Sequence, residues 1–139
     1  MPYQTPVQPD VELVVRTYLV RTASRVRALV GNDRVYTVVP KDATFPMLRV
    51  VRFGGGPVRQ VPHHLIAAAL QLDAYGGSKA DARRLIDTAL AELADMAEHT
   101  HDGAVVTGVN IGSARYLPEP DFTPPKPRYT ADVTVIIHP

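Results

Sequence analysis

The last stretch of the chain alternates apolar and polar side chains more regularly than any other segment, which only a half-buried β-strand requires. Successive side chains of a strand point to opposite faces of its sheet, so one face of this segment belongs to a core. We therefore expect a strand here, in a sheet with one covered face. The inward set is Tyr129, Ala131, Val133, Val135 and Ile137, and the outward set is Thr130, Asp132, Thr134, Ile136 and His138.

An amphipathic helix over residues 78–97 is the clearest element that could cover such a face. Ser78 followed by Asp81 is a variant of the capping box that opens helices. Apolar residues then recur every three or four positions, which is typical of a helix with one buried side. The stripe consists of Ala82, Leu85, Ile86, Ala89, Leu90, Leu93 and Ala94. Three acidic side chains, Asp87, Glu92 and Asp95, are expected to face water.

The first helix is expected to run from an N-cap at Asp10 to Gly31, because Gly tolerates the left-handed conformation that ends helices. Two strands should follow. Residues 34–39 are rich in β-branched side chains and stop at a proline, and residues 47–53 are equally apolar. The glycines after this second strand indicate a flexible turn between strands; they are Gly54, Gly55 and Gly56.

Residues 65–75 fit two structures. The run of three alanines favours a helix, whereas apolar residues at every second position favour a strand. Residues 104–111 are a clearer strand, which could continue through residues 114–116. The five prolines of residues 117–127 predict an extended loop that stands off the sheet. Long loops of this kind are often functional, and we expect this one to contact a partner.

Together these elements predict an α+β fold, with two helices packed on one face of a mostly antiparallel sheet of about four to five strands. The 139 residues fit a single domain, residues 1–139, with a flexible N-terminus over residues 1–8. The chain has no cysteine, which excludes disulfide frameworks and thiolate chemistry. No apolar run approaches the roughly 20 residues that span a bilayer, and the start of the chain lacks the features of a signal peptide. We expect a soluble protein assembled in the cytoplasm, without membrane contact.

Catalytic and metal-binding groups are sparse. The histidines form two pairs, His63 with His64 and His99 with His101, about 35 residues apart in the sequence, whereas zinc usually takes three or four ligands. No serine lies in a nucleophile-elbow motif, and no Lys-Ser/Thr pair follows the three glycines. Four arginines on the first helix are too few for a nucleic-acid footprint. The sequence predicts no enzyme, no metal site and no cofactor.

Charge is divided unevenly along the chain. Residues 1–60 hold nine Lys/Arg and four Asp/Glu, a balance of +5, whereas residues 61–139 hold six and ten, a balance of −4. One explanation is chance spacing of surface charges. The other is that copies of the chain meet through faces of opposite charge.

Five segments, in their order along the chain, resemble the tail terminator and tail completion proteins of siphophages, especially those of phages that infect actinobacteria. The segments are Val26 to Gly31, Arg34 to Tyr36, Phe45 to Val50, Leu70 to Gly76 and Ser78 to Leu85. The similarity spans roughly residues 11–137 and is positional, not catalytic. It implies that residues 65–75 form a strand. The long proline loop is a departure from the family pattern.

The resemblance implies a structural virion protein that acts as a tail terminator: a hexameric ring that caps the tail tube, stops its polymerisation and joins the tail to the head connector. The implied partners are other copies of the chain, the major tail tube protein and the head–tail connector protein, with DNA passing through the lumen without specific binding. Two alternatives are a head–tail connector or neck adaptor, and a small host α+β binding domain. The residues expected at assembly contacts are Arg21, Arg25, Gly54, Gly55, Gly56 and Phe122.

Overall fold

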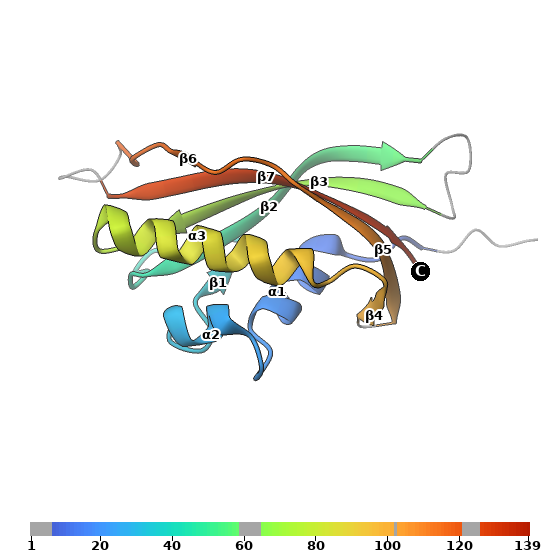
Figure 1. The fold of residues 1–139 in the computed structure, drawn as a ribbon, viewed down its shortest axis with the longest axis horizontal. Helices are drawn as coiled ribbons and strands as arrows, with labels where there is room; N and C mark the ends of the chain where they lie inside the picture. Colours follow the sequence, from blue (N-terminus) through green and yellow to red (C-terminus); the bar gives the residue numbers. More distant parts are fainter. Residues whose placement is uncertain (1–6, 59–64, 102, 121–125) are drawn as a thin grey trace, which may run out of the picture.

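The structure is a computed structural model that describes residues 7–58, 65–101, 103–120 and 126–139. The described residues form an α+β fold in which a curved sheet is covered on one side by helices (Figure 1). The helices are α1 (Val11–Leu19), α2 (Arg25–Leu29) and α3 (Lys79–Ala94). The strands are β1 (Val35–Tyr36), β2 (Met47–Pro57), β3 (Ile66–Tyr75), β4 (His99–His101), β5 (Ala104–Ile111), β6 (Arg115–Tyr116) and β7 (Arg128–His138).

The sheet has seven strands in the order β1-β2-β3-β7-β5-β4, with β6 paired to β7 beyond the end of β5. The expected four to five strands were too few, because the three-residue β4 was not predicted and β6 is a separate two-residue strand and not a continuation of residues 104–111. The pair β1–β2 is parallel and every other strand pair of the described chain is antiparallel. The sheet is therefore mixed, although mostly antiparallel as expected.

The two central strands, β3 and β7, pair over ten residues from Ile66↔Ile137 to Tyr75↔Arg128. The predicted alternation of β7 is confirmed, since its inward set is buried and packs on the helices. The strand interpretation of residues 65–75 is also confirmed. Its alanines lie opposite the glycines of β2 and the middle of β7, where a neighbouring strand on each side overrides helix propensity.

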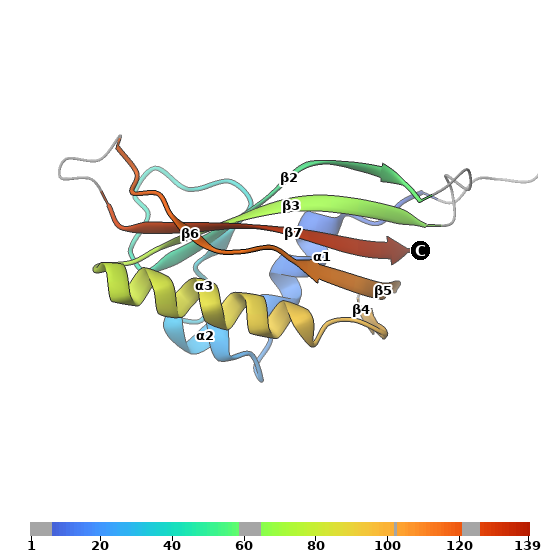
Figure 2. The ribbon, with the colours of Figure 1, turned by 45° about the horizontal axis from the view of Figure 1, so that its top comes forward.

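All three helices lie on one side of the sheet (Figures 1 and 2). The Ser78 hydroxyl accepts a hydrogen bond from Asp81 N at 3.1 Å, so the predicted start of α3 is confirmed. The first helix was expected to be continuous as far as Gly31. It breaks instead between Leu19 and Arg25. Ser24 is the cause, because its hydroxyl caps α2 by accepting from Val26 N at 3.1 Å.

The interpretation of the three glycines as a turn was wrong. Gly54, Gly55 and Gly56 lie inside β2 and pair with Ala69, Ala68 and Ala67 of β3. A bulge precedes them: the register shifts between Arg52 and Gly54, so Phe53 has no opposite residue. Bulges redirect side chains away from a regular strand, and Phe53 is 59% exposed. The predicted strand of residues 34–39 is also shorter than expected: β1 is only Val35–Tyr36, paired to Leu48 and Arg49, and Arg16 Nε donates to the carbonyl oxygen of Val35 at 2.8 Å.

The base of the proline-rich segment is attached to the sheet and does not stand off it. Leu117 N donates to the Arg128 carbonyl at 2.9 Å, and Glu119 forms a β-bridge with Lys126. The side chains of Arg128 and Glu119 form an ion pair at 3.1 Å. Residues 121–125, which include Phe122, lie outside the described residues, as do residues 1–6 of the N-terminus.

Candidate assembly surface

A buried acidic side chain on α3 connects the helices to one another. The carboxylate of Glu92 accepts hydrogen bonds from Arg21 Nη2 at 2.7 Å and from Arg25 Nε at 2.7 Å. It also accepts from the backbone N–H of Arg25 at 3.0 Å, at the start of α2. Glu92 is 3% exposed, so the expectation that it faces water was wrong. Asp87 and Asp95 are exposed as expected.

The ionisation of Glu92 follows from these partners. Burial alone would raise the pKa of its carboxyl group, but the hydrogen bonds from Arg25 and Arg21 outweigh burial and lower the pKa to about 2. Both arginines remain partly exposed. The network therefore desolvates one carboxylate more than its cations, and it holds the segment that carries α1 and α2 against α3.

A shallow pocket of about 240 Å³ lies next to this network. Its lining residues are Val14, Thr17, Tyr18, Arg21, Thr100 and His101. The Arg21 guanidinium stacks over the Tyr18 ring at 3.7 Å, and His101 Nε2 lies 2.9 Å from the Met96 carbonyl oxygen. Because these polar groups face one another, the pocket presents no convergent set for a reacting substrate. The described residues contain no group of three or more His, Asp or Glu side chains placed to hold a metal ion.

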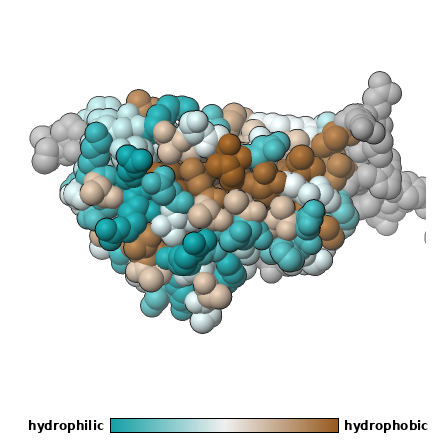
Figure 3. All heavy atoms as spheres, in the orientation of Figure 1, coloured by the Kyte–Doolittle hydropathy of each residue, from teal (hydrophilic) through white to brown (hydrophobic). Residues whose placement is uncertain are grey.

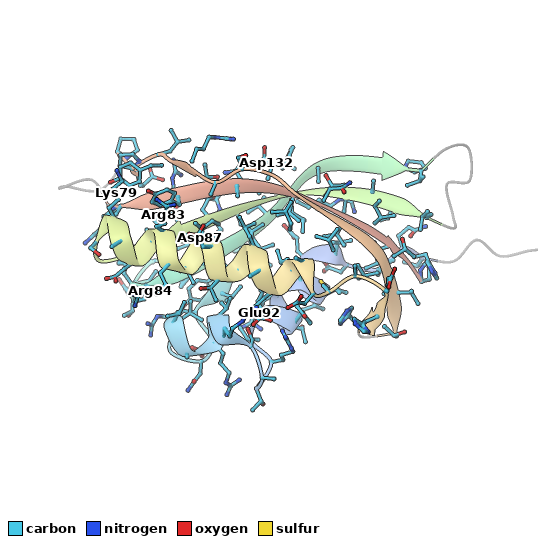
Figure 4. The ribbon with its side chains drawn as sticks, in the orientation of Figure 1. Lys79, Arg83, Arg84, Asp87, Glu92 and Asp132 are labelled. Atoms are coloured by element: carbon cyan, nitrogen blue, oxygen red, sulfur yellow. The ribbon has the colours of Figure 1, made fainter. Side chains whose placement is uncertain are left out.

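The two ends of α3 differ. Near its N-terminal end lie Lys79, Arg83 and Arg84, whereas Glu92 lies near the other end beside α1 and α2 (Figure 4). Lys79 Nζ sits 4.6 Å from the centre of the Tyr116 ring. Arg83 pairs with Asp87 one turn later at 3.5 Å, an exposed pair that adds little stability.

The sheet face away from the helices carries a transverse polar row. Arg49, Asp73 and Thr130 lie opposite one another on β2, β3 and β7. Asp73 is fully buried, accepts from Gln71 Nε2 at 3.0 Å and lies 3.4 Å from Arg49 Nε. Arg49 and Asp73 form an ion pair between β2 and β3, which is a structural role, whereas Thr130 Oγ1 is buried without a hydrogen-bond partner among the described residues.

An apolar strip runs along the edge of the sheet where β5 passes α3. Figure 3 shows apolar side chains gathered along the strands above α3. Leu90 of α3, Val109 of β5 and Ala114 are only partly buried, and Ile111 of β5 is 40% exposed. This strip is an apolar surface next to an open strand edge, and surfaces of this kind mark contacts with other proteins.

Comparison with known proteins decides the family. Residues 17–134 match the model of the family described as tail completion protein gp17. The chain belongs to this family. As a tail completion protein it is a structural component of a phage tail.

A solved structure has the same fold. It is a chain of the "Virion of native gene transfer agent (GTA) particle", with a TM-score of 0.59 and 15% identity over 93% of this chain and 95% of that chain. A search of curated proteins finds no match. In the described residues of the tail completion protein, no helix has the length and apolar character needed to cross a membrane.

The expected contact residues of the tail completion protein do not form one surface. Arg21 and Arg25 contact Glu92, whereas Gly54, Gly55 and Gly56 lie in β2. Phe122 lies outside the described residues. Sequence reasoning missed the burial of Glu92, although an acidic residue beside the stripe residue Leu93 was a signal.

Proposed function

We propose that this tail completion protein is a tail terminator, which closes into a hexameric ring on the end of the tail tube, stops tube polymerisation and provides the surface for the head connector. The observation that carries the proposal is the family match over residues 17–134. Its partners would be further copies of the chain, the major tail tube protein and the head–tail connector protein. The protein would reside in the virion, at the head–tail junction, with DNA passing through the ring.

The site geometry supports a binding role over a catalytic one. Three sets of ion pairs connect elements of the described chain to one another, namely Glu92 with Arg21 and Arg25, Asp73 with Arg49, and Glu119 with Arg128. A heterologous ring requires two different surfaces on each subunit. The charge balance of +5 in residues 1–60 against −4 in residues 61–139 favours contacts between unlike surfaces of neighbouring copies.

A neck adaptor is the alternative within the virion, and one experiment separates the two. Tail tube protein would be polymerised in the presence of the purified chain, and tube lengths and tube ends would be imaged by electron microscopy. A terminator shortens the tubes as its concentration rises and adds a cap of density at one end. Tubes of unchanged length with bare ends would overturn the proposal. Binding to connector-bearing heads but not to tubes would favour the adaptor.

A further inference from the structure

The outer edge of β5 is open beyond the first three residues of the strand. Strand β4 pairs with β5 from Ala104 to Val106, and beyond Val106 no strand of the described chain lies on that edge. On its inner edge β5 continues to pair with β7 as far as Ile111, opposite Val133. Residues 107–111 therefore present an open edge, which soluble proteins normally protect.

The register decides which of these residues turn their backbone groups outward. Gly112 continues the register of β5 by one residue and donates its N–H to the carbonyl oxygen of Asp132, opposite it, at 2.8 Å. In an antiparallel pair, residues that exchange hydrogen bonds directly alternate with residues whose N–H and C=O groups point to the other side. The backbone groups of Val109 and Ile111 therefore point to the open edge, whereas those of Asn110 point to β7.

The same two residues also carry apolar side chains. Val109 lies opposite Val135, and Ile111 opposite Val133, both in the buried set of β7, so the two side chains face the helices. Val109 is partly buried against the core and Ile111 is 40% exposed. The strand that fits this edge best combines, at every second residue, a free N–H group with an apolar side chain.

Residues 2–8 of the chain have this alternation. The odd positions keep their N–H groups and include two large apolar side chains, whereas the even positions are proline and glutamine. The odd set is Tyr3, Thr5 and Val7, and the even set is Pro2, Gln4, Pro6 and Gln8. Because proline has no N–H group, an added strand with its prolines on the outer side pairs with β5 only and protects the new edge. Val7 is the most exposed large apolar side chain of the described residues, at 90%.

Two other stretches of the chain lie outside the described residues, and neither fits this edge. Residues 59–64 are joined at their ends by a backbone hydrogen bond from Val58 N to the Leu65 carbonyl oxygen at 2.9 Å. Residues 121–125 lie above the β-bridge at the base of the proline-rich segment. A short stretch whose two ends are held together in this way cannot extend along a separate sheet edge.

The added strand has to come from a second copy. Arg52 N of β2 donates to Glu12 Oε2 at 2.8 Å, so α1 begins near the β2 edge of the sheet, and β3 and β7 lie between β2 and β5 (Figure 2). A strand beyond β5 would lie four strand spacings, about 19 Å, from β2. The three residue steps from Val7 to Asp10 span only roughly 10 Å. In its own copy Val7 also lies outside every strand of the described chain.

We infer that residues 3–7 of one copy add a strand to residues 107–111 of a second copy, with the side chains of Tyr3 and Val7 on the apolar strip. Each copy gives a strand from its β2 side and receives one at its β5 edge, so the contact is head-to-tail. The backbone hydrogen bonds of an added strand contribute affinity, and its alternate side chains contribute specificity. The inference rests on the proposed ring and names its contact.

Site-directed cross-linking tests this contact, because the chain has no cysteine of its own. The variant Val7→Cys is mixed with Ile111→Cys or, as control, with Leu117→Cys, since Leu117 is 44% exposed against 40% for Ile111. A short bismaleimide joins the thiols, and one variant of each mixture carries a size tag. The reactions are run in solution and on tail tubes, and thermal melting checks that each variant is folded.

The mixture of Val7→Cys with Ile111→Cys is expected to give a one-to-one cross-linked dimer, with at least tenfold more product than the Leu117→Cys control. The double variant Val7→Cys/Ile111→Cys should give a ladder of oligomers. Equal yields with the control, or a double variant that cross-links only within one chain, would overturn the contact. A thiol at position 111 that becomes protected on tubes without any 7–111 product would also overturn it, because the tube protein would then cover this edge.

A matched pair of proline substitutions tests the alternation. In the Val7→Cys background, Thr5→Pro removes an N–H group that points to β5, whereas Gln4→Pro removes one that points away. Neither residue lies in the described fold, so both variants should melt like the parent. Thr5→Pro should lower the yield of the product with Ile111→Cys at least fivefold, whereas Gln4→Pro should change it less than twofold. Equal effects of the two substitutions would overturn the inferred pairing.

The reactions on tail tubes separate this inference from the proposed function. Folded variants that cap tubes, but yield no 7–111 product in solution or on tubes, would disprove this interface and leave the terminator role intact. Variants and wild-type protein that neither cap tubes nor cross-link would disprove both. A ladder from the double variant without any effect on tubes would support the contact and count against the terminator role.

Discussion

Glu92 and Arg25, 67 residues apart in the sequence, are joined by two hydrogen bonds, one from the guanidinium and one from the backbone N–H. The carboxylate thus binds the first residue of α2 at the point where a helix leaves its N–H groups unpaired. A negative charge at a helix start is favourable. One side chain of α3 therefore fixes the start of α2 and is itself kept ionised.

Replacing this carboxylate by an amide should destabilise the fold. Glu92→Gln removes two charge-assisted hydrogen bonds but leaves arginines that water can reach, so we expect a loss of about 2–3 kcal/mol in the free energy of unfolding. Urea unfolding measures this loss. The matched control is Asp87→Asn on the same helix, where the exposed pair with Arg83 should contribute under about 0.5 kcal/mol. Equal effects of the two substitutions would contradict the role of Glu92.

The same residue makes stability depend on pH. The pKa of Glu92 is lower in the folded state, about 2, than its ordinary value of 4.5. Its contribution is therefore complete above pH 4.5 and is lost as the pH falls toward 2. The shift corresponds to about 3 kcal/mol of stability. Urea unfolding of wild type and Glu92→Gln at several pH values should show the two curves converging below pH 4.5, and parallel curves would count against this linkage.

Gly55 should tolerate no side chain, unlike its neighbours. Its φ is +97°, and a Cβ atom there would collide with the carbonyl oxygen of Ala67. Gly55→Ala should cost at least about 2 kcal/mol, because left-handed strain and displacement of β3 add. Gly54→Ala and Gly56→Ala are the controls, since no atom lies within 4 Å of a Cβ at either position. Similar melting temperatures for all three variants would refute this explanation.

Charge reversal at Arg21 and Arg25 should destabilise the fold itself, so any loss of self-association in this variant would follow from unfolding. The double variant Arg21→Glu/Arg25→Glu places two further carboxylates beside the buried Glu92, and we expect a large fall in melting temperature. Circular dichroism melting measures it, with Arg84→Glu on the exposed side of α3 as control. A variant that melts like wild type but fails to self-associate would restore these arginines as contact residues.

Self-association should weaken as salt is added. Exposed charges of opposite sign on neighbouring copies are screened beyond about 8 Å at physiological ionic strength. Light scattering across a sodium chloride series should therefore give a lower mean mass at high salt, while the apolar strip retains part of the affinity. A mass that rises with salt would indicate that apolar contacts act alone.

The elements whose side-chain periodicity matched their environment could be predicted from the sequence. The alternation of β7 and the stripe of α3 required one buried face each, and both lie where expected except that Ala94 of the stripe is exposed and Leu90 is partly buried. The strand from Ile66 to Tyr75 required the family resemblance. Its helix-favouring alanines are held in a strand by neighbours distant in sequence, and a local pattern contains no information about such neighbours.

Capping and pairing explain the differences. Ser24 interrupts the first helix through one hydroxyl, which the apolar spacing of that segment does not reveal. The glycines of β2 look like a turn because a sequence does not indicate a strand on the other side, here the alanines of β3. Glu92 looked exposed because its two arginine partners come from a segment about 70 residues away. The contact role of Val7 and Ile111 remains a prediction.

The long antiparallel ladder of β3 and β7 has a geometric consequence for any ring. If successive copies meet through the β2 side and the β5 side, the angle between one neighbour and the next is the angle between two edges of a single sheet. That angle is determined by the twist that accumulates from strand to strand. The number of subunits in the ring would then be determined by the curvature of the sheet in each subunit. Altering the bulges at Phe53 or Thr107 would change the number of subunits more than the affinity between them.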